Sequence, residues 1–141
     1  MIAAVMIRGS VSTRGEVRDT LKMLRLTRVN HCSLLQENES VKGMLRKAQS
    51  HVTWGRIDPR TLEMLVSRRG RLPGDRRIPG EKAKEIARKL EAGRGFEELG
   101  IKPIFRLSPP SGGLRSVRLA YPGGDLGNRE EAINELIRRM V

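Results

Sequence analysis

The chain has 141 residues, and its 28 Lys+Arg against 16 Asp+Glu give a net charge of +12. Arginine supplies 21 of these cations, and its planar guanidinium pairs with phosphate at two points, which a lysine cannot do. This balance predicts a large polyanion as the partner; a basic composition without function and a solvated arginine face are the alternatives. The lone Cys32 excludes an intramolecular disulfide and fits a reducing cytoplasm. No apolar run approaches the ~20 residues of a membrane span, and four aromatic residues are too few for a sheet that stacks several bases.

Strand and helix signals alternate over the first 58 residues. The apolar run Met1–Ile7 predicts a buried central strand. Thr13 and Glu16 have the spacing of a capping box, so we expect a helix to follow and to end near Arg25. The next elements expected are a strand at Cys32–Gln36, a helix capped by Asn38 or Ser40, and a strand at His51–Trp54 closed by Gly55.

The remaining residues predict helices joined by loops rich in glycine and proline. Asp58-Pro59 is a strong helix start, because it places an acceptor at the N-cap and proline at the first helical position. The elements expected after it are a helix ended by Gly70, a helix from about Glu81 to Ala92, one turn at Phe96–Leu99, a strand at Ile104–Leu107, and a C-terminal helix capped by Asn128 with Glu131 in the capping-box position. Composition thus divides the chain into a core domain, residues 1–58, and a helical, loop-rich extension, residues 59–141.

Five arginines lie within the ten residues Arg68–Arg77, where only Asp75 opposes them. Gly70, Pro73 and Gly74 predict a turn there. Two further groups of cations also fall in predicted loops, at 102–106 and 115–118. Loops held between capped helices can follow an irregular nucleic-acid surface without a full disorder-to-order transition.

Residue types that could support catalysis or bind metal do not have the spacing that such sites require. His31 and Cys32 with the distant His51 provide no ligand pattern for zinc, and the chain has no phosphate-binding loop of a nucleotide hydrolase. Cys32 lies in an apolar strand pattern without a neighbouring cation that would lower its pKa, which favours a buried, inert thiol. We therefore predict no catalytic residue, no cofactor and no metal.

Several ordered motifs resemble family thirty of the large-subunit ribosomal proteins. The segment Val17–Gly55 resembles the core of that family through L-R-L-T-R-V-N-H at Leu24–His31 and G-M-L-R-K at Gly43–Lys47. The remainder resembles the archaeal and eukaryotic long form through R-G-R-L-P-G-D at Arg69–Asp75 and F-R-L-S-P-P at Phe105–Pro110. No basic arm precedes the first strand, so we expect an archaeal protein.

The resemblance implies an α+β fold: a β-α-β-α-β, ferredoxin-like core with a three-stranded antiparallel sheet in the order 3-1-2 and two helices on one face. It also implies a non-catalytic constituent of the large (50S) ribosomal subunit that binds 23S rRNA, lies near 5S rRNA and neighbouring ribosomal proteins, and is not a homo-oligomer. The matching motifs and the basic loops together give the predicted rRNA-binding residues: Arg8, Arg14, Arg25, Arg28, Asn30, His31, Arg46, Lys47, Trp54, Arg68, Arg69, Arg71, Arg76, Arg77, Arg106, Arg115 and Arg118.

Some of these assignments have structural alternatives. Asn30 and His31 could form a turn that ends a strand, and Trp54 could pack against a helix instead of stacking on a base. For the whole chain, a free-standing RNA chaperone or another basic nucleic-acid-binding protein would suit the same charge. A ribonuclease is disfavoured, because the two histidines fall at the ends of separate strands.

Overall fold

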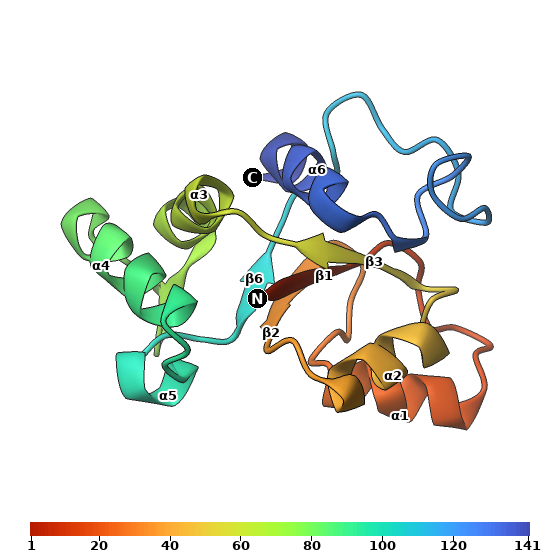
Figure 1. Ribbon diagram of the computed structural model, residues 1–141, viewed down its shortest axis with the longest axis horizontal. Coiled ribbons are helices and arrows are strands. Elements are labelled where there is room, and N and C mark those ends of the chain that lie inside the picture. Colours follow the sequence, from red (N-terminus) through yellow and green to blue (C-terminus); the bar gives the residue numbers. More distant parts are fainter.

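A computed structural model describes all of residues 1–141. Its centre is a five-stranded sheet in the order β6-β2-β1-β3-β7, beside a separate hairpin, β4-β5 (Figure 1). β1 pairs antiparallel with both β2 and β3, which confirms the predicted 3-1-2 core; β6 adds to β2 antiparallel and β7 adds to β3 parallel. The strands are β1 (Ile2–Met6), β2 (His31–Leu35), β3 (Val52–Arg56), β4 (Arg71–Leu72), β5 (Arg76–Arg77), β6 (Ile104–Arg106) and β7 (Gly127–Asn128).

Helices cover both faces of the sheet. Figure 1 shows α1 and α2 on one face and α3 and α6 on the other, with α4 packed along α3. The mixed α+β fold predicted from the sequence is confirmed. The helices are α1 (Gly15–Met23), α2 (Glu39–Lys47), α3 (Pro59–Arg69), α4 (Gly80–Glu91), α5 (Phe96–Leu99) and α6 (Ile133–Met140), with a short 3-10 turn, η1 (Glu130–Ala132), before α6.

The N-terminal segment is buried on both faces of the sheet, and its side chains alternate between two hydrophobic clusters. Ile2, Ala4 and Met6 belong to the cluster beneath α1 and α2. The alternate residues, Ala3, Val5 and Ile7, belong to the cluster that α3, α4 and α6 complete. A strand covered on both faces is expected to be apolar throughout, which is why Met1–Ile7 predicted it correctly.

The extension shares a hydrophobic core with the first 58 residues. Cys32 and Leu34 of β2 lie in the same cluster as Leu62 of α3, Phe105 of β6 and Leu136 of α6. The extension also supplies both edge strands of the sheet. The boundary at residue 58 stays a prediction, with the two segments joined by sheet pairing and by this common core.

Two of the predicted helix starts are confirmed. The Oδ1 atom of Asn38 accepts a hydrogen bond from the N–H of Val41 at 2.8 Å, so Asn38 and not Ser40 caps α2. Asp58 caps α3 in the same way, through the N–H of Thr61 at 2.6 Å, with Pro59 at the first helical position.

The two predicted capping boxes are wrong, each because a neighbouring strand takes up the capping residue. The hydroxyl of Thr13 lies 3.4 Å from Nε2 of His51, next to β3, and Arg14 occupies the N-cap of α1 without a side-chain bond. Asn128 pairs with β3 as part of β7, and its Oδ1 accepts from the N–H of Glu130 at 3.0 Å. Asn128 therefore caps the 3-10 turn, and α6 starts later than expected.

The predicted turn in the arginine cluster is a two-stranded hairpin. Arg71 pairs with Arg77 and Leu72 with Arg76, while the chain reverses through Gly74 and Asp75 at φ values of 86° and 59°. The backbone N–H of Lys102 donates to the carbonyl of Arg71 at 2.9 Å. The hairpin is thus fixed against the segment that leads into β6.

Asp58 connects α3 to α6, so its replacement should destabilise the fold. Besides capping α3, its carboxylate accepts from Nη2 of Arg138 at 3.2 Å. We expect Asp58→Ala to lower the free energy of unfolding by about 1–2 kcal/mol, since an N-cap acceptor is lost. Urea denaturation followed by circular dichroism measures this loss.

Asp58→Asn is the matched control, because asparagine caps as well as aspartate but carries no charge. Burial raises the pKa of Asp58, yet the hydrogen bonds from Thr61 and the charges of Arg138 and Arg60 outweigh burial and hold the pKa below its usual value. A carboxyl with a lowered pKa stabilises the fold above its ordinary pKa, and this stabilisation is lost as the pH falls through the lowered value. Asp58→Asn should therefore keep most of the stability at pH 7 and lose this acid-dependent part; an alanine variant as stable as wild type would contradict the capping role.

Candidate nucleic-acid interface

Cations from three separate segments surround one surface cavity of about 690 Å³. One segment precedes and begins β2, one ends α3 and forms the hairpin, and one leads into β6. Five of the lining residues are arginine or lysine and a single one is a carboxylate. The lining residues are Thr27, Arg28, His31, Arg69, Arg71, Asp75, Lys102, Pro103, Ile104 and Arg106.

Sheet pairing brings these segments together. β2 and β6 run antiparallel, with His31 opposite Arg106 in the register, so the start of β2 meets the end of β6. The guanidinium of Arg69 donates to the carbonyl of Arg106 at 3.3 Å and to Oγ of Ser108 at 2.8 Å, which ties the end of α3 to the same place. The cavity is therefore held by backbone pairing and by a cross-link between segments, and its cations are positioned before any ligand arrives.

Asp75 is the only acidic group of the cavity. Its Oδ1 accepts from Nζ of Lys102 at 2.7 Å and lies 3.9 Å from Nη2 of Arg106. The hydrogen bond from Lys102, followed by the positive charges of Lys102 and Arg106, lowers the pKa of Asp75. One carboxylate against five cations leaves the cavity with an excess positive charge, which suits a ligand that carries several negative charges.

His31 forms a polar wall of this cavity, and its neighbour Cys32 is buried in the sheet. Burial, and then the positive charges of Arg106 and Arg28, lower the pKa of His31, so its ring is neutral at pH 7. Its Nδ1 is buried and has no hydrogen-bond partner. Burial raises the pKa of the Cys32 thiol to about 12, which confirms the predicted inert thiol.

The cavity brings together five of the predicted site residues: Arg28, His31, Arg69, Arg71 and Arg106. Sequence reasoning omitted Lys102 from its binding residues and read Asp75 only as a charge within the arginine cluster. The available signal was the basic group at 102–106, which lies directly before a predicted strand. Its position opposite the hairpin could not be derived from the sequence.

Three predicted arginines and Asn30 lie near the loops that flank β1 and β2. Arg8, Arg14 and Arg25 are exposed. Asn30 has a φ of 69°, its N–H donates to the carbonyl of Met6, and its carbonyl accepts from Leu107. Its backbone is thus the turn that the structural alternative describes, and RNA contact by its side chain stays a prediction.

Trp54 and the α2 cations line a different cavity, of about 390 Å³. Trp54 is 9% exposed and packs in the cluster beneath α1 and α2, which matches the packing alternative. Arg46 lines this cavity, while Nζ of Lys47 lies 3.8 Å from a carboxylate oxygen of Glu16. Three cations and three carboxylates line the cavity (Lys42, Arg46, Arg56; Glu37, Glu130, Glu131), so it has no excess charge.

The arginine cluster does not form one surface. Arg69 and Arg71 line the basic cavity, whereas Arg68 lines a shallow pocket along α3 with Arg60. Arg76 and Arg77 are exposed on β5. Their part in RNA binding stays a prediction.

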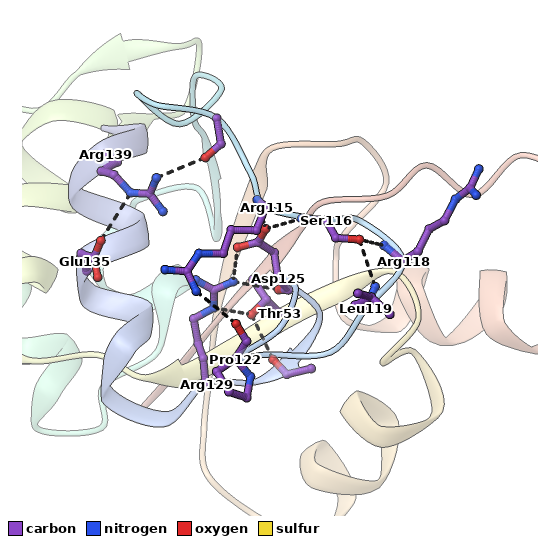
Figure 2. A network of polar contacts seen from close by, with 12 residues as sticks. Thr53, Arg115, Ser116, Arg118, Leu119, Pro122, Asp125, Arg129, Glu135 and Arg139 are labelled. Carbon is purple, nitrogen blue, oxygen red and sulfur yellow. Dashed lines mark hydrogen bonds and ion pairs between the residues drawn. The ribbon is translucent and has the colours of Figure 1, made fainter.

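The loop from 108 to 127 carries Arg115 and Arg118, and a buried ion pair holds it in place. Figure 2 shows Arg129 beside Asp125 and Thr53, while the side chain of Arg118 points away from this network. Nη2 of Arg129 donates to Oδ1 of Asp125 at 3.1 Å, and its Nε donates to Oγ1 of Thr53 at 2.8 Å. The guanidinium also lies 5.1 Å from the centre of the Tyr121 ring. Arg129 is therefore a structural cation that nothing in the sequence separates from the exposed arginines.

Two other kinds of site were sought in the structure. No group of three or more His, Cys, Asp or Glu side chains is placed to hold a metal ion. None of the helices combines the length and the apolar composition needed to cross a bilayer.

Comparison with known proteins identifies the class to which this fold and its basic cavity belong. Residues 2–52 match the family model described as Ribosomal protein L30p/L7e. The chain is thus a ribosomal protein, and full-length relatives identify its family. It is 44% identical to the large ribosomal subunit protein uL30 of Methanococcus maripaludis strain C5, over 99% of this chain and 98% of the relative.

Two further relatives share the same name over their whole length. The uL30 protein of Methanosphaera stadtmanae is 40% identical over 100% of both chains. That of Nanoarchaeum equitans is 40% identical over 100% of this chain and 99% of the relative. The chain belongs to the uL30 family of large-subunit ribosomal proteins, as its motifs predicted, and these relatives are archaeal, in line with the expected long form.

Proposed function

We propose that the chain is a non-catalytic constituent of the large (50S) ribosomal subunit, where it binds and braces 23S rRNA and lies near 5S rRNA and neighbouring proteins. Membership of the uL30 family supports the ribosomal role, and with it a location in the cytoplasmic ribosome. The observation that carries the RNA-binding part is the basic cavity, in which five cations from three segments face one space against a single carboxylate.

The proposed mechanism is the pairing of phosphates at fixed separations. Arg28 comes from the core, Arg71 from the hairpin and Arg106 from β6, and pairing between β2 and β6 holds two of these segments rigidly. Because the segments are positioned in advance, little ordering entropy opposes binding. Guanidinium forks on such a frame hold phosphates of separate rRNA strands at set distances.

Neutralising the cavity should weaken RNA binding more than the lost charge alone explains. We expect the triple variant Arg28→Gln, Arg71→Gln, Arg106→Gln to bind archaeal large-subunit rRNA about a hundredfold or more weakly, at about tenfold for each charge-assisted contact. Arg69 is left intact, because its guanidinium cross-links β6 to α3. Filter binding at fixed salt measures the change.

A second triple variant removes the same charge elsewhere. Lys82, Lys84 and Arg88 are exposed on α4 and line no part of the cavity. Their replacement by glutamine should weaken binding only by the general loss of three charges. Equal losses for the two triple variants would mean that the cavity is not the RNA site.

A free-standing RNA chaperone is the alternative function, since the same charge would suit it. Sedimentation of the endogenous protein separates the two. A stable subunit constituent co-migrates with large subunits after a high-salt wash, whereas a chaperone remains in the light fractions.

A further inference from the structure

The carboxylate in the basic cavity has a role that the positive charges around it suggest. We propose that Asp75 occupies, in the free protein, the place of an RNA phosphate, so that an incoming phosphate competes with it for Lys102 and Arg106. This inference deepens the proposed function and rests on it. It makes Asp75 a residue that limits affinity, although it lies within an RNA-binding cavity.

The contacts of Asp75 match those that a phosphate oxygen would make. Its Oδ1 is 2.7 Å from Nζ of Lys102 and 3.9 Å from Nη2 of Arg106, so one anionic oxygen faces two cations from the β6 segment. Lysine and arginine are the side chains that pair with phosphate oxygens in the same way. No other acidic residue lines this cavity.

The position of Asp75 in the hairpin allows it to move away. It lies in the turn between β4 and β5, where Gly74 precedes it, and its side chain is 53% exposed. The hairpin itself is held by the bond from the N–H of Lys102 to the carbonyl of Arg71, which does not involve the carboxylate. An exposed ion pair contributes little to stability, so Asp75 can release Lys102 without unfolding the hairpin.

Either position of the carboxylate opposes a phosphate. If Asp75 stays on Lys102, the phosphate meets a like charge within a few ångströms; if it leaves, an ion pair must be broken. Removing the charge should therefore raise affinity about three- to tenfold at low salt, the size expected for one like-charge interaction across a solvent-exposed site.

The opposite role is a brace, in which Asp75 holds Lys102 and Arg106 in the geometry that RNA needs. The two roles predict opposite signs. Removal of a competitor tightens binding, whereas removal of a brace weakens it.

Asp75→Asn is the test variant, because asparagine tolerates the left-handed conformation at φ 59° and has the same shape without the charge. Asp75→Gly is a second variant that accepts this backbone without strain. The matched control is Glu85→Gln on α4, where Glu85 pairs with Lys89 at 2.9 Å, also on the surface but outside the cavity. Melting by circular dichroism checks that each variant folds.

Two probes are titrated into each protein at low salt: archaeal large-subunit rRNA by filter binding, and inorganic tripolyphosphate by calorimetry. We expect both Asp75 variants to bind both probes about three- to tenfold more tightly than wild type, and Glu85→Gln to change affinity by less than twofold. Equal gains for Asp75→Asn and Glu85→Gln would overturn the competition, because general charge would then explain them. Weaker binding by a folded Asp75→Asn would also overturn it and identify a brace.

The tripolyphosphate arm separates this inference from the proposed function. If Asp75→Asn tightens tripolyphosphate binding while no form of the protein binds rRNA, the competition stands and the proposed RNA role fails. If rRNA binds and the Asp75 variants match wild type with both probes, the RNA role stands and the competition fails.

Discussion

The affinity of the chain for large-subunit rRNA should fall by about three to five decades between 50 and 200 mM salt, if roughly 6–10 phosphates are neutralised. The reason is that each phosphate paired with arginine or lysine releases condensed counterions, and added salt opposes that release. The net charge of +12 and the five cations of the basic cavity make this the main source of binding. Filter binding over a series of salt concentrations gives the slope of log affinity against log salt.

The triple variant of Arg28, Arg71 and Arg106 serves as the internal check. Each phosphate contact removed should reduce the magnitude of that slope by about one. A steep slope that the triple variant leaves unchanged would assign the counterion release to other arginines, such as Arg76 and Arg77. A slope near zero in the wild-type protein would exclude phosphate pairing as the source of affinity.

The core of the fold could be predicted because its signals are local. A continuous apolar run marked β1, and the acceptors at Asn38 and Asp58 marked the starts of α2 and α3. β7 left no comparable signal, since it consists of Gly127 and Asn128 and pairs with β3 more than 70 residues earlier in the chain. Asn128 was therefore read from its neighbours as a helix cap, although the sheet determines its conformation.

The close contact of β3 with η1 was likewise invisible in the sequence. Gly55 was read as the end of a strand, but it lies inside β3. A Cβ atom there would collide with the carbonyl oxygen of Glu130. Glycine is required by this approach of two backbones, and a strand end and a close contact use the same residue.

The candidate site was predicted as a set of residues but not as an arrangement. Charge and motifs selected Arg28, Arg69, Arg71 and Arg106, which the cavity unites, together with arginines that lie elsewhere. What groups the first four is the pairing of β2 with β6 and the anchoring of the hairpin by Lys102, both between distant segments. Composition cannot distinguish a cation that lines a cavity from one that is exposed or, like Arg129, buried.

Replacing Arg129 should cause the largest loss of stability among single arginine substitutions. Its side chain is 4% exposed and that of Asp125 is 6% exposed, so the pair lies outside solvent. Arg129→Met leaves the carboxylate buried without its cation, which costs about 3–5 kcal/mol when one partner of a buried pair is removed. Urea unfolding followed by circular dichroism should therefore show a markedly lower midpoint.

The same substitution at Arg118 is the control, because that side chain points into solvent and surface changes usually stay within about 0.5 kcal/mol. A second comparison isolates the charge. In an Asp125→Asn background, Arg129→Met should cost less than in wild type, since no unpaired carboxylate remains. If the two substitutions instead add independently, the stability comes from packing of the Arg129 stem and its bond to Thr53, and the ion pair itself contributes nothing to holding the loop against β3.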